Sequence, residues 1–168
     1  MIKKIFGWLA KILAGFILAS VLTVVLYKFI PPPITPPMII RVFEGILNGK
    51  NIGIEKTWKS YQEISPNLFR AFISGEDGRF LSHEGIDWKA VENAKKYNQA
   101  HAGVRKHGAS TITMQTAKNT FLWHGRVYAR KALEVYFTYM IEAIWGKKRI
   151  LEIYRLLMLT KRTSEISK

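Results

Sequence analysis

Residues 128–145 read YARKALEVYFTYMIEAIW, and this stretch decides the fold class of the chain. Its large apolar residues recur every three or four positions and therefore share one face of a helix: Leu133, Phe137, Met140, Ile141 and Ile144. Gly146 follows, at the place where a helix C-terminus favours glycine, and a further helix is expected from about Lys147. No stretch keeps the alternation of apolar and polar residues that is typical of a strand. We therefore predict a mainly α fold.

Three more helices are predicted upstream of this one. Ser65-Pro66 is a helix start, and the apolar residues after it recur at helical spacing as far as about Gly75. Asp87 is placed to cap a second helix, and Ser110 or Thr111 a third that ends near residue 122. The polar stretch 98–108 is expected to be a loop.

The N-terminal region predicts a membrane anchor. Residues 12–27 (ILAGFILASVLTVVLY) carry no charge, and three lysines precede Ile12. With the apolar residues before it, this stretch is long enough to span a bilayer, and the lysines predict a cytoplasmic N-terminus. A cleaved signal peptide is the alternative, but bulky residues 27–30 (YKFI) stand where small ones are expected. We predict an anchor over residues 1–30 and an exported domain after it.

A proline-rich linker is predicted over residues 31–37, as a stiff spacer that holds the domain close to the membrane. The domain is expected to span residues 38–154, beginning with an apolar helix over 38–47 that lies on the bilayer. A divergent tail covers residues 155–168.

Composition limits the chemistry. The 168 residues include no cysteine, which excludes disulfides, thiolate nucleophiles and cysteine zinc sites. The net charge is +14, from 26 Lys+Arg against 12 Asp+Glu, and this excess favours anionic partners such as phosphates and phospholipids. Nucleic acid is not expected, because the domain is exported and shows no recognised module.

Three polar clusters are candidates for a site. Residues 76–85 (EDGRFLSHEG) place carboxylates directly after an apolar helix, where partial desolvation suits a general base; a polar loop with a capping carboxylate is the alternative. Residues 108–115 (GASTITMQ) combine a glycine turn with a hydroxyl-capped helix start, which suits phosphate, although ordinary capped helices look the same. Arg126, Arg130, Lys131 and Glu134 fit a pyrophosphate clamp or a surface salt-bridge ladder. A metal site of Glu76, Asp77 and His83 lacks a supporting spacing.

Together, these clusters resemble the motifs of the family-51 peptidoglycan glycosyltransferases, in the monofunctional, single-anchor form known as biosynthetic peptidoglycan transglycosylases. The matches come in the family's order: Glu76-Asp77 with Phe80, His83 and Gly85 for EDxxFxxHxG; Gly108, Ser110, Thr111 and Gln115 for GxSTxxQQ; Arg130, Lys131 and Glu134 for RKxxE; and residues 147–154 (KKRILEIY) for the start of KxxILxxYLN.

The resemblance implies a lysozyme-like helical lobe with a small membrane-apposed jaw. It implies that Glu76 is the general base, which takes a proton from the acceptor sugar's 4-hydroxyl, and that Glu134 is a second catalytic residue on the donor side. Substrate and pyrophosphate binding would fall to the other motif residues and two nearby cations: Asp77, Phe80, His83, Ser110, Thr111, Gln115, Lys118, Arg126, Arg130 and Lys131. The substrates would be lipid II and a lipid-linked glycan, at the bacterial cytoplasmic membrane, with cell-wall synthesis proteins as further partners. No cofactor or dedicated metal site is required, although Mg²⁺ or Mn²⁺ at the pyrophosphate is compatible.

Two departures from the family pattern stand out. Met114 replaces the first of the paired glutamines. After Tyr154, the expected Leu-Asn is replaced by Arg155-Leu156, which predicts a truncated or frameshifted chain. In such a chain we expect the apolar helix faces of 128–145 and 147–159 to be partly uncovered, and its activity is in question. The alternatives are a membrane-anchored wall-cleaving glycoside hydrolase or lytic enzyme, and a non-catalytic basic membrane-tethered scaffold.

Overall fold

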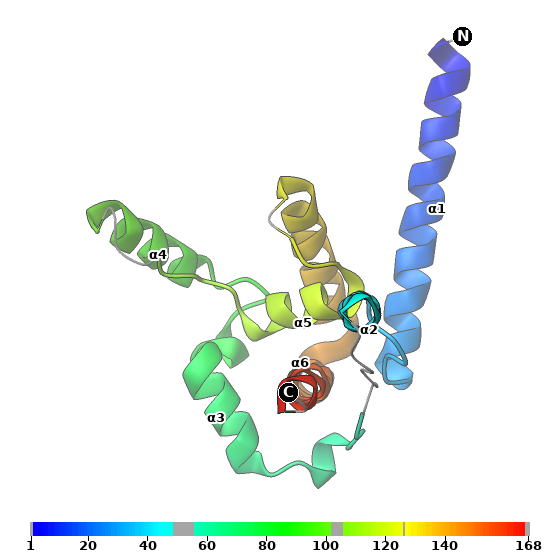
Figure 1. The fold of residues 1–168 in the computed structure, drawn as a ribbon. Helices are drawn as coiled ribbons and strands as arrows, with labels where there is room; N and C mark the ends of the chain where they lie inside the picture. Colours follow the sequence, from blue (N-terminus) through cyan, green and yellow to red (C-terminus); the bar gives the residue numbers. More distant parts are fainter. Residues whose placement is uncertain (1, 49–55, 102–105, 126, 167–168) are drawn as a thin grey trace.

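The protein is built from helices (Figure 1). The computed structural model describes residues 2–48, 56–101, 106–125 and 127–166, and these contain no strand. In chain order the elements are α1 (Ile2–Phe29), α2 (Pro36–Leu47), the short 3₁₀ turn η1 (Tyr61–Glu63), α3 (Pro66–Glu76), η2 (Phe80–Ser82), α4 (Trp88–Ala100), α5 (Ile112–Phe121) and α6 (Tyr128–Ile166). The prediction of a mainly α fold is confirmed.

The long element α6 consists of two helices that meet at Gly146. This residue has φ 74° and ψ 166°, a conformation that glycine adopts without the steric cost that a Cβ would add. The predicted helix over 128–145 and the break after it are confirmed. The second helix runs on through the stretch predicted as a divergent tail, and Leu156 and Leu157 are buried in the core. Of the apolar face over 147–159 that was expected to be partly uncovered, these two leucines are covered, whereas 37% of Leu159 is exposed.

The core lies where α5 crosses α6 (Figure 1). The Phe121 ring of α5 stacks on Phe137 with centroids 4.5 Å apart and leans on Trp145 at 5.9 Å. Both helix starts predicted from capping residues are present: the Thr111 side chain accepts a hydrogen bond from the Met114 amide, and Asp87 accepts one from the Ala90 amide.

Helix α1 has the length and composition of a membrane-spanning helix over Lys3–Phe29. Its large apolar side chains are mostly exposed, but one side of its C-terminal half packs against α6. The Ser20 and Tyr136 hydroxyls lie 2.7 Å apart, and the Trp145 indole donates to the Val24 carbonyl at 2.7 Å. The polar groups buried here are thus paired, as an apolar surrounding requires. The anchor is part of the folded domain.

The linker predicted over 31–37 is shorter than expected. Pro36 and Pro37 form the first turn of α2, where a missing N–H costs no hydrogen bond. Met38 and Gly45 face inward, whereas an apolar face opposite them is exposed: Ile39, Phe43, Ile46 and Leu47. This helix therefore presents the surface expected of one that lies on a bilayer.

Candidate active site

Glu76 stands at the mouth of a cavity of about 380 Å³. It is the last residue of α3 and its side chain is exposed. Oε2 of Glu76 accepts a hydrogen bond of 3.0 Å from Nε2 of Gln115 on α5. Lys118, one turn further along α5, lines the same cavity. The structure therefore brings together three of the residues predicted from two separate motifs.

The cavity is also lined by two basic side chains that the sequence motifs did not indicate. Arg41 comes from α2 and His124 from the segment between α5 and α6. Arg41 is the only cation in the apolar stretch 36–47, and this isolation is the signal that could have singled it out. Arg41 and Lys118 thus place two cations in the lining of the cavity that also contains Glu76, an arrangement that suits an anionic phosphate group.

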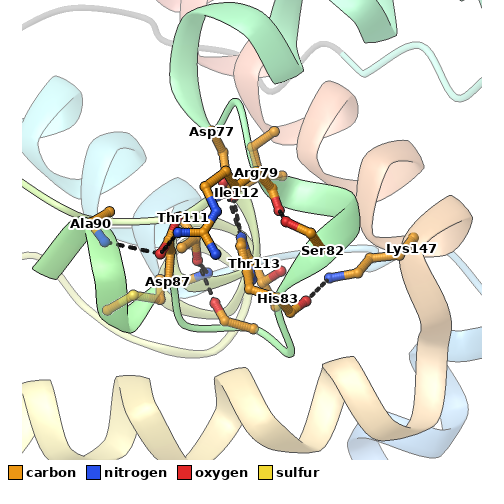
Figure 2. A network of polar contacts seen from close by, with 12 residues as sticks. Asp77, Arg79, Ser82, His83, Asp87, Ala90, Thr111, Ile112, Thr113 and Lys147 are labelled. Atoms are coloured by element: carbon orange, nitrogen blue, oxygen red, sulfur yellow. Dashed lines mark hydrogen bonds and ion pairs between the residues drawn. The ribbon is translucent and has the colours of Figure 1, made fainter.

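Asp77 does not line this cavity but belongs to a buried polar network (Figure 2). Its carboxylate accepts a hydrogen bond from Nε2 of His83, which lies 3.0 Å from both oxygens, and a second from the Ile112 amide at 3.0 Å. That amide belongs to the first residue of α5, where a negative charge stabilises the helix dipole. Because Asp77 directly follows Glu76 in the chain, its hydrogen bond to the Ile112 amide holds the N-terminus of α5 close to Glu76.

Thr111 and Gly85 make a second connection in the same network. The Thr111 hydroxyl donates to the Gly85 carbonyl at 2.5 Å. Gly85 has φ +86°, and a Cβ built on it would lie 2.9 Å from Cγ2 of Thr138 on α6. Only glycine therefore allows the loop to pass this close to α6.

Lys147 closes the network from the far side of the Gly146 kink (Figure 2). Its ammonium donates to the His83 carbonyl at 2.6 Å, lies 4.6 Å from the centroid of the Phe80 ring, and pairs with Glu142. Glu142 in turn accepts from the Thr113 hydroxyl at 2.9 Å. Residues from the first, second and fourth motifs thus meet in one framework that positions Glu76.

The predicted binding residues Asp77, Phe80, His83 and Thr111 belong to this framework and do not line the cavity. Phe80 has no exposed surface, and the other three are at least nine-tenths buried. Any effect that they have on a substrate would pass through their neighbours. Ser110, by contrast, is exposed just before α5.

The RKxxE cluster forms a compact ion-pair group. Arg130 and Lys131 contact the two oxygens of Glu134 at 2.7 and 2.6 Å, and only 3% of the Glu134 surface is exposed. Arg130 also donates to the Gly125 carbonyl at 2.7 Å, next to His124 of the cavity wall. Glu134 itself is not among the residues that line the Glu76 cavity, so the two predicted catalytic glutamates do not share it. Arg126 lies outside the described residues.

Tyr154 lies close to Glu76 and Asp77. Burial, together with the negative charges of these two carboxylates, raises the pKa of the Tyr154 phenol to about 12. Its ring packs edge-on against Phe72 of α3, with centroids 5.2 Å apart. The helix that carries Glu76 therefore rests on a tyrosine that keeps its proton at neutral pH.

Comparison with known proteins agrees with these motifs. A family model described as Transglycosylase matches residues 47–160. The chain is 47% identical over 147 residues to a biosynthetic peptidoglycan transglycosylase of Bdellovibrio bacteriovorus, covering 88% of this chain and 58% of that protein. It is 48% identical over 134 residues to a protein of the same name from Caulobacter vibrioides, covering 80% and 55%. A third, from Rhodospirillum centenum, is 46% identical over 154 residues, covering 92% and 64%.

The chain thus spans between 55% and 64% of the length of these curated relatives. The family model, by contrast, covers more than half of the chain and includes Glu76, the buried network and the RKxxE cluster, whereas Arg41 and the other α2 residues that line the cavity precede the matched range. The chain belongs to the transglycosylase family.

Proposed function

We propose that this chain polymerises the glycan strands of peptidoglycan from a lipid-linked, pyrophosphate-activated precursor. The observation that carries the proposal is that Glu76 and Lys118 line one cavity, with the Glu76 carboxylate held by Gln115. A base and fixed cations in one enclosure are what glycosyl transfer from a diphosphate requires. The names of the relatives support the same activity.

In this proposal Glu76 accepts the proton of the acceptor sugar's 4-hydroxyl. The acceptor oxygen forms a bond to the anomeric carbon of the lipid-linked glycan while the bond from that carbon to the pyrophosphate oxygen breaks, with inversion. The electron pair leaves with the pyrophosphate, whose growing charge is stabilised by Lys118 and Arg41 in the cavity wall. The Gln115 amide keeps the carboxylate in place without neutralising it.

Glu134 has a supporting role in this scheme. Because it is almost fully buried between Arg130 and Lys131, it acts by holding these cations rather than by touching the sugar. Because Arg130 also donates a hydrogen bond to the Gly125 carbonyl, it helps to hold the segment that carries His124 in place. The cluster thus stabilises the His124 side of the cavity without lining the cavity itself.

Within the described residues, no group of three or more His, Asp or Glu side chains is placed to hold a metal by itself. In this proposal the positive charge at the diphosphate comes from Lys118 and Arg41, and Mg²⁺ or Mn²⁺ at the pyrophosphate is compatible with it. Turnover in EDTA, with and without added Mg²⁺ or Mn²⁺, tests this assignment.

The membrane supplies the substrates in this proposal. We place α1 across the bacterial cytoplasmic membrane with its N-terminus inside, and the exposed apolar face of α2 on the outer leaflet. Since α2 also carries Arg41, it connects the lipid surface with the cavity wall. Lipid II and the lipid-linked glycan would enter from the leaflet beside this helix.

The test is incubation of the detergent-solubilised full chain with labelled lipid-linked disaccharide. We expect polymer from the parent, and for Glu76→Gln a loss of about 10²-fold or more, the usual contribution of a general base. Glu84→Gln is the matched control, because Glu84 lies in the same loop, is exposed and does not line the cavity. Polymer formed at the parental rate by Glu76→Gln would remove Glu76 from the base role. Cleavage of finished peptidoglycan without polymer would indicate the hydrolase instead, and binding without turnover the scaffold.

A further inference from the structure

A second cavity, of about 720 Å³, opens at the C-terminal end of the anchor. Lys28 and Phe29 of α1 form one side, and Lys148, Arg149 and Glu152 of α6 form another. The 3₁₀ turn η1 and the start of α3 complete the wall. This cavity shares no lining residue with the cavity of Glu76. It is therefore a separate site.

The charges around this cavity do not cancel. Arg149 is engaged: it pairs with Glu152 at 2.9 Å and donates to the Tyr27 carbonyl at 2.8 and 3.1 Å. Glu152 is also engaged, since it accepts a hydrogen bond from the Tyr61 amide at 2.6 Å. Lys28 and Lys148 remain. Within the described residues neither forms a salt bridge with a carboxylate, and their ammonium groups lie over the rings of Phe29 and Tyr61, respectively. The cavity thus holds two uncompensated cations.

The cavity's position in the chain points to the lipid headgroups. Lys28 directly follows the uncharged stretch 12–27, so it lies where the anchor leaves the hydrocarbon core. Arg149 binds the carbonyl of Tyr27, which fixes the cavity at this end of the anchor. Trp145 and Tyr61 line it as well, and such amphipathic rings are typical of the membrane interface.

We infer that this cavity binds the phosphate of an anionic phospholipid headgroup, between Lys28 and Lys148. Lysine and arginine side chains near a membrane surface attract anionic headgroups electrostatically, and this attraction does not depend on which leaflet supplies the lipid. The acyl chains would lie along the exposed apolar surface of the last turns of α1, where 50% of Leu26 and 73% of Phe29 are exposed. The lipid would be bound whether or not the Glu76 cavity is occupied.

Native mass spectrometry of the full chain, released from detergent micelles, tests this inference. The probes are phosphatidylglycerol, phosphatidylcholine and soluble glycerol 3-phosphate. The test variant is Lys28→Gln/Lys148→Gln. The control is Lys95→Gln/Lys96→Gln, which removes the same charge from exposed positions on α4, away from the cavity. Lys28→Arg/Lys148→Arg keeps both charges, and circular dichroism checks the fold of every variant.

We expect the parent, the control and the arginine variant to retain phosphatidylglycerol in preference to phosphatidylcholine. The glutamine variant should retain it about 30-fold less well, the effect of removing two cations near an anionic lipid. Equal loss in the control would mean attraction by net charge and would overturn the inference. Equal retention of phosphatidylcholine would exclude headgroup recognition. Retention of glycerol 3-phosphate as strong as that of the lipid would show a soluble phosphate site and would also overturn it.

Discussion

Replacement of Gly85 by alanine should destabilise the framework that positions Glu76. The new Cβ would lie 2.9 Å from Cγ2 of Thr138, whereas carbon atoms in contact prefer roughly 3.5–4.0 Å. Thr138 cannot move aside easily, because it is fully buried and its hydroxyl donates to the Glu134 carbonyl at 2.6 Å. The clash therefore falls on a side chain with little freedom.

The expected cost has two parts. A residue with a Cβ at φ +86° pays roughly 1–2 kcal/mol for the left-handed conformation. Overpacking against Thr138 adds about 1–3 kcal/mol. We therefore expect Gly85→Ala to lower the free energy of unfolding by about 2–5 kcal/mol. Chemical unfolding in detergent micelles, followed by circular dichroism and tryptophan fluorescence, measures this change.

Two further variants separate the parts. Gly78→Ala is the matched control, because Gly78 lies in the same loop, has no positive φ, and a Cβ there meets nothing within 4 Å. Thr138→Ser removes the clashing methyl group but keeps the hydroxyl. In the double variant the overpacking part should disappear and the backbone part should remain. A Gly85→Ala protein as stable as Gly78→Ala would refute this account of the loop.

Three other variants test the site and its framework. Lys118→Ala should weaken donor binding about 10-fold or more and leave acceptor binding nearly unchanged, as measured by separate titrations of the two substrates; equal losses would rule out the diphosphate assignment. Lys147→Met should cost about 1–3 kcal/mol in unfolding experiments, because it removes the hydrogen bond to the His83 carbonyl and leaves Glu142 without its cation. Tyr154 has its pKa raised from 10.0 to about 12, so the folded state holds the phenolic proton more tightly than the unfolded chain does. This stabilisation is complete below pH 10 and is lost as the pH rises through about 12, and Tyr154→Phe should abolish that part of the alkaline loss of stability, measured as midpoints between pH 9 and 12.

Much of the fold could be predicted from local signals. The apolar period over 128–145, the stop at Gly146 and the caps at Asp87 and Thr111 all depend on residues close in sequence, and all are present. The helix after Gly146 was predicted as well, but the burial of its later residues could not be, because the burial of Leu156 depends on distant partners. The same holds for the docking of α1. In the sequence, Ser20 is one of several small residues in an apolar span, and only the structure shows that its hydroxyl pairs with that of Tyr136.

The candidate site shows the same division. The motifs identified Glu76 and Gln115, the resemblance added the nearby Lys118, and all three line or border one cavity in the structure. Spacing alone could not distinguish residues that face the cavity from those that support it, because Glu76 and Asp77 are adjacent yet point into different surroundings. The isolation of Arg41 in an apolar stretch could have singled it out, but its place at the cavity could not be predicted, since only the packing of α2 against α5 brings it there.

The hydrogen bonds between α1 and the domain affect how the domain is oriented at the membrane. Val24 and Tyr27 are held through their carbonyls by Trp145 and Arg149, and the Pro32 carbonyl is held by Lys56 at 2.9 Å. Because these hydrogen bonds join the domain to the end of α1 and to the linker, the domain is not free to reorient relative to this helix. The domain tilts together with α1, so the tilt of this helix sets the orientation of the Glu76 cavity relative to the bilayer, and a change in membrane thickness that tilts the helix would change that orientation.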